Sequence, residues 1–186
     1  LEHIEGVPIH AHKTLLPVER ALEVSEWLMS GLAAAHSNGV GLGNINTTDI
    51  LYTAGTTRLP IANVLKLSSD GDIARIHQDF SGFWSVVGDL IGIQEEILLP
   101  IQLVQALAAR GCLPPRDHHM VLGDIPVAES LIAYVGWFQE LRRRVETHAA
   151  RRDLFERLED ATKPAQGDPA VIKAYLADRR RTWGLG

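Results

Sequence analysis

The sequence predicts a mainly α-helical domain with one small β-hairpin, and three patterns along the chain support this fold class. Apolar residues recur at helical spacing along Ala21–Ser37 and again along Phe80–Leu99. Between them, residues 50–62 contain two short apolar runs around the turn Ala54–Thr57. The chain has 186 residues and is 46% hydrophobic, which is enough for one sizeable core. We therefore treat residues 1–186 as a single domain.

The N-terminal half is expected to fold as a helix, the hairpin and a second helix. Pro17 suits the first turn of the helix Ala21–Ser37, and Gly39 provides a left-handed cap after it. Pro60 has no N–H, which limits the second strand of the hairpin to a sheet edge. The two helices should pack together, and Trp84 should be largely buried.

The C-terminal half is predicted to contain three further helices, separated by proline and glycine. Pro100 should end the second helix of the N-terminal half, and residues 114–119 should form a loop. Asp124 should begin a helix with Pro126 in its first turn. The predicted ranges are Ile101–Arg110 for the third helix, a start at Asp124 for the fourth, and Asp168–Arg181 for the last.

Composition restricts the class of protein. The net charge of −5 argues against nucleic acid as the main partner, because nucleic-acid-binding domains usually carry a basic surface. The single cysteine, Cys112, excludes an internal disulfide and favours a cytoplasmic location. No stretch has the roughly 18 uninterrupted apolar residues that a membrane span requires.

One sixteen-residue segment carries the most specific pattern. Residues 36–51 read H-S-N-G-V-G-L-G-N-I-N-T-T-D-I-L. This segment resembles, without gaps, the catalytic loop of bacterial Hanks-type Ser/Thr protein kinases, H-A-x-G-I-V-H-R-D-I-K-P-E-N-I-L. Weaker matches in the same order cover residues 1–95. They are Leu1–Ile9 for the hinge between the kinase lobes, Arg58–Leu65 for R-V-K-L-I-D-F-G, and Gly82–Gly88 for D-V-W-S-L-G-V.

The resemblance implies a kinase C-terminal lobe whose catalytic groups are lost. Asn44 stands at the catalytic base and Asn63 at the magnesium-binding Asp, both of which are Asp in the family. Asn46 replaces the catalytic-loop Lys, and Asp49 replaces the metal-binding Asn. Gly82 would replace the anchoring Asp of the buried central helix. Because an amide cannot accept a proton at neutral pH, this pattern predicts a pseudokinase with no catalytic residue.

Candidate ligand sites are few. Leu51 corresponds to the apolar residue under adenine in the family, so ATP binding without metal is an alternative to the prediction of no cofactor. The other interpretation is that Leu51 belongs to the ordinary core. No metal site is predicted, because the adjacent His118 and His119 rarely converge on one ion. Asp49 recruited to a metal would instead give an atypical nucleotide-binding kinase.

The predicted function is regulatory protein binding, as a scaffold without enzymatic activity. Arg142, Arg143 and Arg144 form a candidate surface for an anionic or phosphorylated protein partner, although Glu140 and Glu146 would balance them on a solvated face. The resemblance suggests a phosphopeptide-reading domain or an active kinase as the partner. It also suggests the cytoplasm of a bacterium, and some members of the family are cytoplasmic parts of larger envelope proteins. An unrelated helical adaptor domain remains the other alternative.

Overall fold

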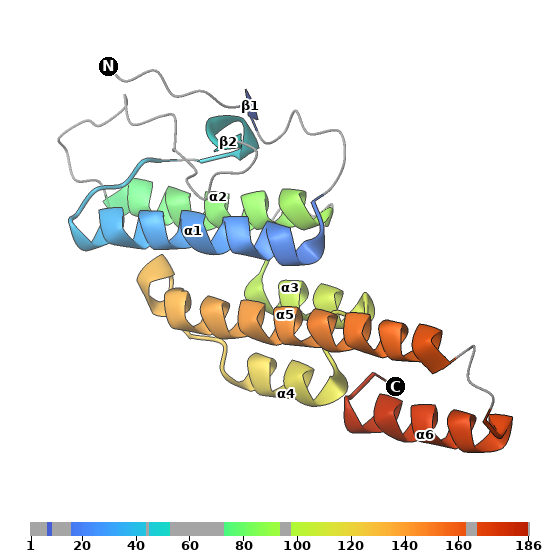
Figure 1. The fold of residues 1–186 in the computed structure, drawn as a ribbon. Coiled ribbons are helices and arrows are strands. Elements are labelled where there is room, and N and C mark those ends of the chain that lie inside the picture. The colour runs from blue at the N-terminus through green and yellow to red at the C-terminus, as the bar shows by residue number, and fades with distance from the viewer. Residues whose placement is uncertain are drawn as a thin grey trace.

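A computed structural model of the chain describes residues 7–8, 16–43, 45–52, 73–93, 98–162 and 167–185, and the structural statements below concern these residues. Helices dominate this part of the chain, as the sequence predicted (Figure 1). They are α1 (Val18–Ser37), α2 (Ile73–Ile91), α3 (Pro100–Ala109), α4 (Pro115–Gly123), α5 (Leu131–Thr162) and α6 (Pro169–Thr182). Within the described ranges, no helix is long and apolar enough to cross a membrane.

Two short strands accompany the helices. Strand β1 (Val7–Pro8) pairs antiparallel with β2 (Leu51–Tyr52), and a single 3₁₀ turn, η2 (Thr47–Asp49), precedes β2. The predicted hairpin at residues 50–62 is not confirmed, because residues 53–62 lie outside the described part of the chain. The described strand of that hairpin, β2, pairs with a segment from the start of the chain instead.

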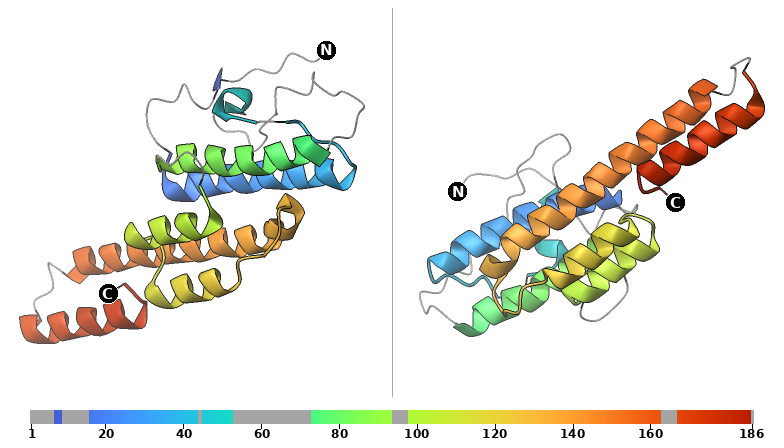
Figure 2. Two further views of the ribbon diagram at one scale, coloured as in Figure 1. Left: turned by 180° about the vertical axis from the view of Figure 1, so that it is seen from behind. Right: turned by 90° about the horizontal axis from the view of Figure 1, so that it is seen from below.

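The core lies where α1, α2 and α5 meet. Helix α1 packs against both α2 and α5, and the views in Figures 1 and 2 show the α1–α2 layer lying on the layer of α3 and α5. Trp84 of α2 is 1% exposed, which confirms the prediction of its burial. Its ring makes edge contacts with Phe83 and Tyr134, at centroid distances of 5.0 and 5.5 Å. Such aromatic contacts add about 0.5–1.5 kcal/mol each to the stabilisation from burial.

The bounds predicted for the second helix are wrong at both ends. Helix α2 begins at Ile73, a full two turns before Phe80, and it ends at Ile91. The end is set by Gly92, whose φ of 69° lies in the left-handed region that favours glycine. The N–H of Ile93 then donates back to the carbonyl of Gly88 at 2.8 Å, which closes the helix before Pro100 is reached.

The predictions around α4 and α5 also need correction. Residues 115–119, expected in a loop, form the first turns of α4, because Pro115 occupies a position in the first turn where its missing N–H costs nothing. The helix predicted from Asp124 begins seven residues later, at Leu131, and Pro126 lies outside it. Instead the carbonyl of Pro126 accepts a hydrogen bond from the Tyr134 hydroxyl at 2.8 Å.

Helix α6 lies beside the C-terminal half of α5, where the two helices extend beyond the ends of α1 and α2 (Figure 2). As predicted, Asp168 caps its start, accepting a hydrogen bond from the N–H of Ala170 at 2.9 Å. No residue of α6 is buried. Its C-terminal end is attached to α5 by an edge contact between Trp183 and Phe155, with ring centroids 6.2 Å apart.

Candidate functional site

The loop after α1 lies directly on the first turns of α2. A Cβ atom at Gly41 would lie 2.7 Å from the Cβ of Arg75, and one at Gly82 would lie 2.7 Å from the carbonyl oxygen of Ile45. Both distances are shorter than real side chains tolerate, so only glycine at these two positions permits the approach. The loop that the sequence likened to a catalytic loop is therefore seated on α2 by backbone contact.

A buried carboxylate holds this loop in place. Asp79 of α2 is fully buried, and its Oδ2 and Oδ1 accept hydrogen bonds from the backbone N–H groups of Leu42 and Gly43, both at 2.7 Å. Nε2 of His36, at the end of α1, lies 3.1 Å from Asp79 Oδ2. One side chain thus joins the end of α1, the loop and the start of α2.

The physical chemistry of a buried acid explains why this contact fixes the loop. A carboxylate is an acceptor-only group, and removing it from water is costly unless its lone pairs meet donors. Here both oxygens of Asp79 receive a short backbone hydrogen bond, which is the charge-assisted kind that is shorter and stronger than a neutral one. The chain at Leu42 and Gly43 cannot move away without removing both backbone donors from this buried carboxylate and leaving only His36 beside it.

This finding corrects the role given to Gly82. The resemblance placed Gly82 at the position of the anchoring aspartate of the central helix. In the structure the anchoring carboxylate comes from Asp79, about one helical turn earlier on the same helix, and Gly82 provides the space for Ile45. An acidic residue preceding an aromatic helix face could have signalled the position, but its partners lie 36 to 43 residues away in the sequence.

The predicted catalytic-loop positions follow the anchored segment. Asn44 and Asn63 lie outside the described residues. Asn46 is exposed, and its Oδ1 accepts hydrogen bonds from the N–H of Thr48, at 2.8 Å, and from the Thr48 hydroxyl. This is an Asx-type turn, which starts the 3₁₀ turn that contains Asp49.

Leu51, the predicted adenine floor, lies in β2 directly after the 3₁₀ turn. The structure describes its backbone and that of Asp49, so their assignment to adenine and to metal stays a prediction. Asn46, Asp49 and Leu51 are thus brought together only by their closeness in sequence. The neighbouring segment that would contribute Asn63 lies outside the described residues.

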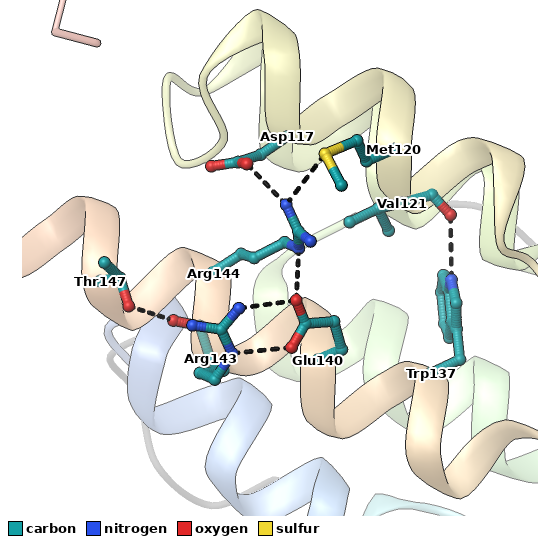
Figure 3. Close-up of polar contacts among 8 residues, drawn as sticks. All are labelled: Asp117, Met120, Val121, Trp137, Glu140, Arg143, Arg144 and Thr147. Carbon is teal, nitrogen blue, oxygen red and sulfur yellow. Dashed lines mark hydrogen bonds and ion pairs between the residues drawn. The ribbon is translucent and has the colours of Figure 1, made fainter. Parts of the chain in front are cut away.

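The three arginines of α5 are all paired with acidic side chains of the same chain. Arg142 donates to Glu26 of α1 at 2.7 Å and to Glu146 of α5 at 2.8 Å. Arg143 makes a two-pronged contact with Glu140, with both distances 2.7 Å (Figure 3). This geometry fits the other interpretation of the arginines, in which Glu140 and Glu146 balance their charge.

Arg144 connects two helices. Figure 3 shows its guanidinium reaching from α5 to Asp117 of α4, at 2.6 Å, while its Nε donates to Glu140 at 2.7 Å. Hydrogen bonds from Arg143, together with the charges of Arg143 and Arg144, lower the pKa of Glu140 to about 2. Beside this cluster, the Trp137 indole N–H donates to the Val121 carbonyl at 3.0 Å, so α4 is held on α5 at two points.

The two adjacent histidines of α4 stand close to each other. The rings of His118 and His119 have centroids 5.4 Å apart. Across the described ranges of the chain, no group of three or more His, Cys, Asp or Glu side chains could hold a metal ion.

The single cysteine, Cys112, is a free thiol. Burial, together with the charge of Glu19, raises its pKa.

Comparisons of the chain with protein families, with curated proteins and with solved structures gave no match.

Proposed function

We propose that the chain is a catalytically inactive, kinase C-lobe-like domain that works as a regulatory protein-binding module. The observation that carries the proposal is the anchored loop. In the kinase family that the chain resembles, the segment matching residues 36–51 is the catalytic loop, and the central helix that follows it carries an anchoring Asp. Asp79 binds Leu42 and Gly43, which stand at the first two positions of the H-R-D motif.

The sequence of this loop supports the loss of chemistry. The residue directly after Gly43 is Asn44, which stands where the catalytic base is expected. A general base contributes about 10²–10⁴-fold to a rate, and an amide cannot fill that role. Asn63 removes a second carboxylate, the one expected to bind magnesium. The frame of a loop is retained, and the groups that would transfer phosphate are replaced.

Function through binding follows from this combination. A loop whose shape is fixed by a buried charge, but which has no catalytic group, contributes through the surface it supports. A phosphopeptide-reading domain or an active kinase in the bacterial cytoplasm is the proposed partner class, and no cofactor is needed. Arg142 and Arg144 connect helices, so of the three arginines Arg143 is the one most available to such a partner, with its side chain 63% exposed.

Phosphoryl transfer is the direct test of inactivity. The full chain, incubated with labelled ATP, magnesium and a generic protein acceptor, should show no incorporation above that of a heat-denatured control. Magnesium-dependent incorporation that disappears in Asp49→Ala would contradict the proposal and support the atypical kinase in which Asp49 binds metal.

Nucleotide binding is tested separately, by thermal unfolding with ATP in the presence and absence of magnesium. We expect no magnesium-dependent increase in the melting temperature. A shift that Leu51→Trp abolishes in a still-folded protein would show an occupied adenine site and replace the scaffold with a nucleotide-gated module.

For the binding function itself, Arg143→Glu should weaken capture of a purified candidate partner, whereas the exposed control Arg157→Glu should not.

A further inference from the structure

A cavity of about 530 Å³ lies between α4, α5 and the C-terminal end of α6. It lies outside the anchored loop, and it shares Arg143 with the surface proposed for a protein partner, but its binding of a small ligand is tested separately from that function. Arginines from all three helices line it, together with the indole of the residue that ends α6. They are Arg116 of α4, Arg143, Arg144 and Arg151 of α5, Arg181 of α6, and Trp183.

The charge of the residues at this cavity is positive, opposite in sign to the net charge of the whole chain. The chain carries a net charge of −5, yet five arginines line this cavity. Three carboxylates offset them: Glu140 binds Arg143 and Arg144, Asp117 binds Arg144, and Asp178 binds Arg181 at 3.1 Å. Two positive charges therefore remain in excess at the cavity.

The excess charge belongs to groups whose donors are available. Arg116 and Arg151 make no hydrogen bond or ion pair to another residue in the described ranges, and both are exposed. Each guanidinium has five N–H donors, so Arg143, which uses two of its nitrogens on Glu140, also retains free donors. The three carboxylates hold the paired arginines, while Arg116 and Arg151 line the cavity without such a partner among the described residues.

We propose that this cavity binds a small phosphoryl polyanion, of which pyrophosphate is the simplest example. The planar fork of a guanidinium matches two oxygens of a phosphoryl group, which a point charge does not. Arginines that come from three separate helices are bridged best by a ligand with more than one phosphoryl group. The cavity volume leaves room for an organic group beside the Trp183 ring.

The test uses the full chain, with pyrophosphate as the probe in a buffer of about 20 mM salt, because screening weakens exposed charge pairs at higher salt. Binding is followed by titration calorimetry and by the ¹⁵N–¹H signals of the four tryptophan indoles. We expect the Trp183 signal, assigned with Trp183→Phe, to move on titration, while those of the core residues Trp84 and Trp137 stay in place.

The variants locate the site. Replacing both free arginines, Arg116→Gln with Arg151→Gln, removes no described internal contact and should weaken pyrophosphate binding about tenfold or more. The matched control is Arg157→Gln, an exposed arginine of α5 that pairs with Asp153 and does not line the cavity. It should change the affinity by less than about twofold.

Three outcomes would overturn the proposal. The first is an unmoved Trp183 signal at several millimolar pyrophosphate. The second is equal weakening by Arg157→Gln, which would mean diffuse attraction to the arginine-rich surface. The third is binding to vesicles of anionic phospholipid, or to a phosphorylated peptide, without any binding of free pyrophosphate. Inorganic phosphate binding at the same site more weakly than pyrophosphate would support the requirement for two phosphoryl groups.

Discussion

Two carboxylates of this protein, Asp79 and Glu140, are held by N–H donors in opposite surroundings. Asp79 is fully buried and binds backbone groups of a loop, while the side chain of Glu140 is 40% exposed and binds two arginines of its own helix. Burial makes the first contact obligatory, because an unpaired charge in the core is very costly. Water competes with the second, so an exposed ion pair contributes little. The same chemical group therefore fixes the backbone of a loop where it is buried, and only positions neighbouring arginine side chains where it is exposed.

Removal of the buried carboxylate should have the largest effect. Asp79→Ala leaves the N–H groups of Leu42 and Gly43 without acceptors, and we expect the free energy of unfolding to fall by about 3 kcal/mol. Urea unfolding followed by far-UV circular dichroism measures the change. The control is Asp89→Ala, an exposed acid of the same helix, which should cost less than about 0.5 kcal/mol. Equal losses in the two variants would mean that Asp79 is not an anchor.

Arginines of the exposed network should give smaller and unequal effects. Arg144→Gln breaks the contact between α5 and Asp117 of α4, and we expect a loss of about 1 kcal/mol. Arg143→Gln breaks only a pair within α5, so its loss should be less than about 0.5 kcal/mol. The same denaturant measurement compares them. A larger loss for Arg143→Gln would remove the distinction between pairs that connect helices and pairs within one helix.

The smallest expected effect is the pH dependence contributed by Glu140. Its pKa is lowered from 4.5 to about 2, so the folded state holds the carboxylate ionised more strongly than the unfolded state. This stability is present above pH 4.5 and is lost as the pH falls toward 2. Because the side chain is partly exposed, we expect about 0.3 kcal/mol or less. The difference in unfolding free energy between the native protein and Glu140→Gln should shrink from pH 6 to pH 3; a constant difference would contradict it.

Sequence patterns predicted those parts of the fold that depend on local order. The helical spacing before Ser37 gave α1, the burial of Trp84 followed from the apolar face of α2, and Asp168 was identified as a cap. The ends of helices were harder to predict, because a proline was expected to end a helix in places where it does not. Gly92 ends α2 well before Pro100, while Pro115 begins a helix that had been expected as a loop.

The candidate site could not be predicted from local sequence patterns, because its contacts join residues that are far apart in the sequence. Asp79 binds groups 36 to 43 residues away, so its role follows only from the packing of α1, the loop and α2. The pairing of Arg143 and Arg144 with Glu140 was partly visible, since residues three and four apart share a helix face. The contact of Arg144 with Asp117, and the cavity that Arg116 and Arg151 share, require the placement of α4 on α5.

The central claim is that a buried carboxylate holds the loop after α1 in a fixed shape, and amide hydrogen exchange of the native protein tests it most directly. The N–H groups of Leu42 and Gly43 should exchange as slowly as core amides of α2, because opening them exposes the Asp79 charge. The N–H of Thr48, which binds the exposed side chain of Asn46, is the internal reference and should exchange much faster. Exchange of Leu42 and Gly43 at the rate of Thr48 would contradict the anchor, and with it the observation that carries the proposed function.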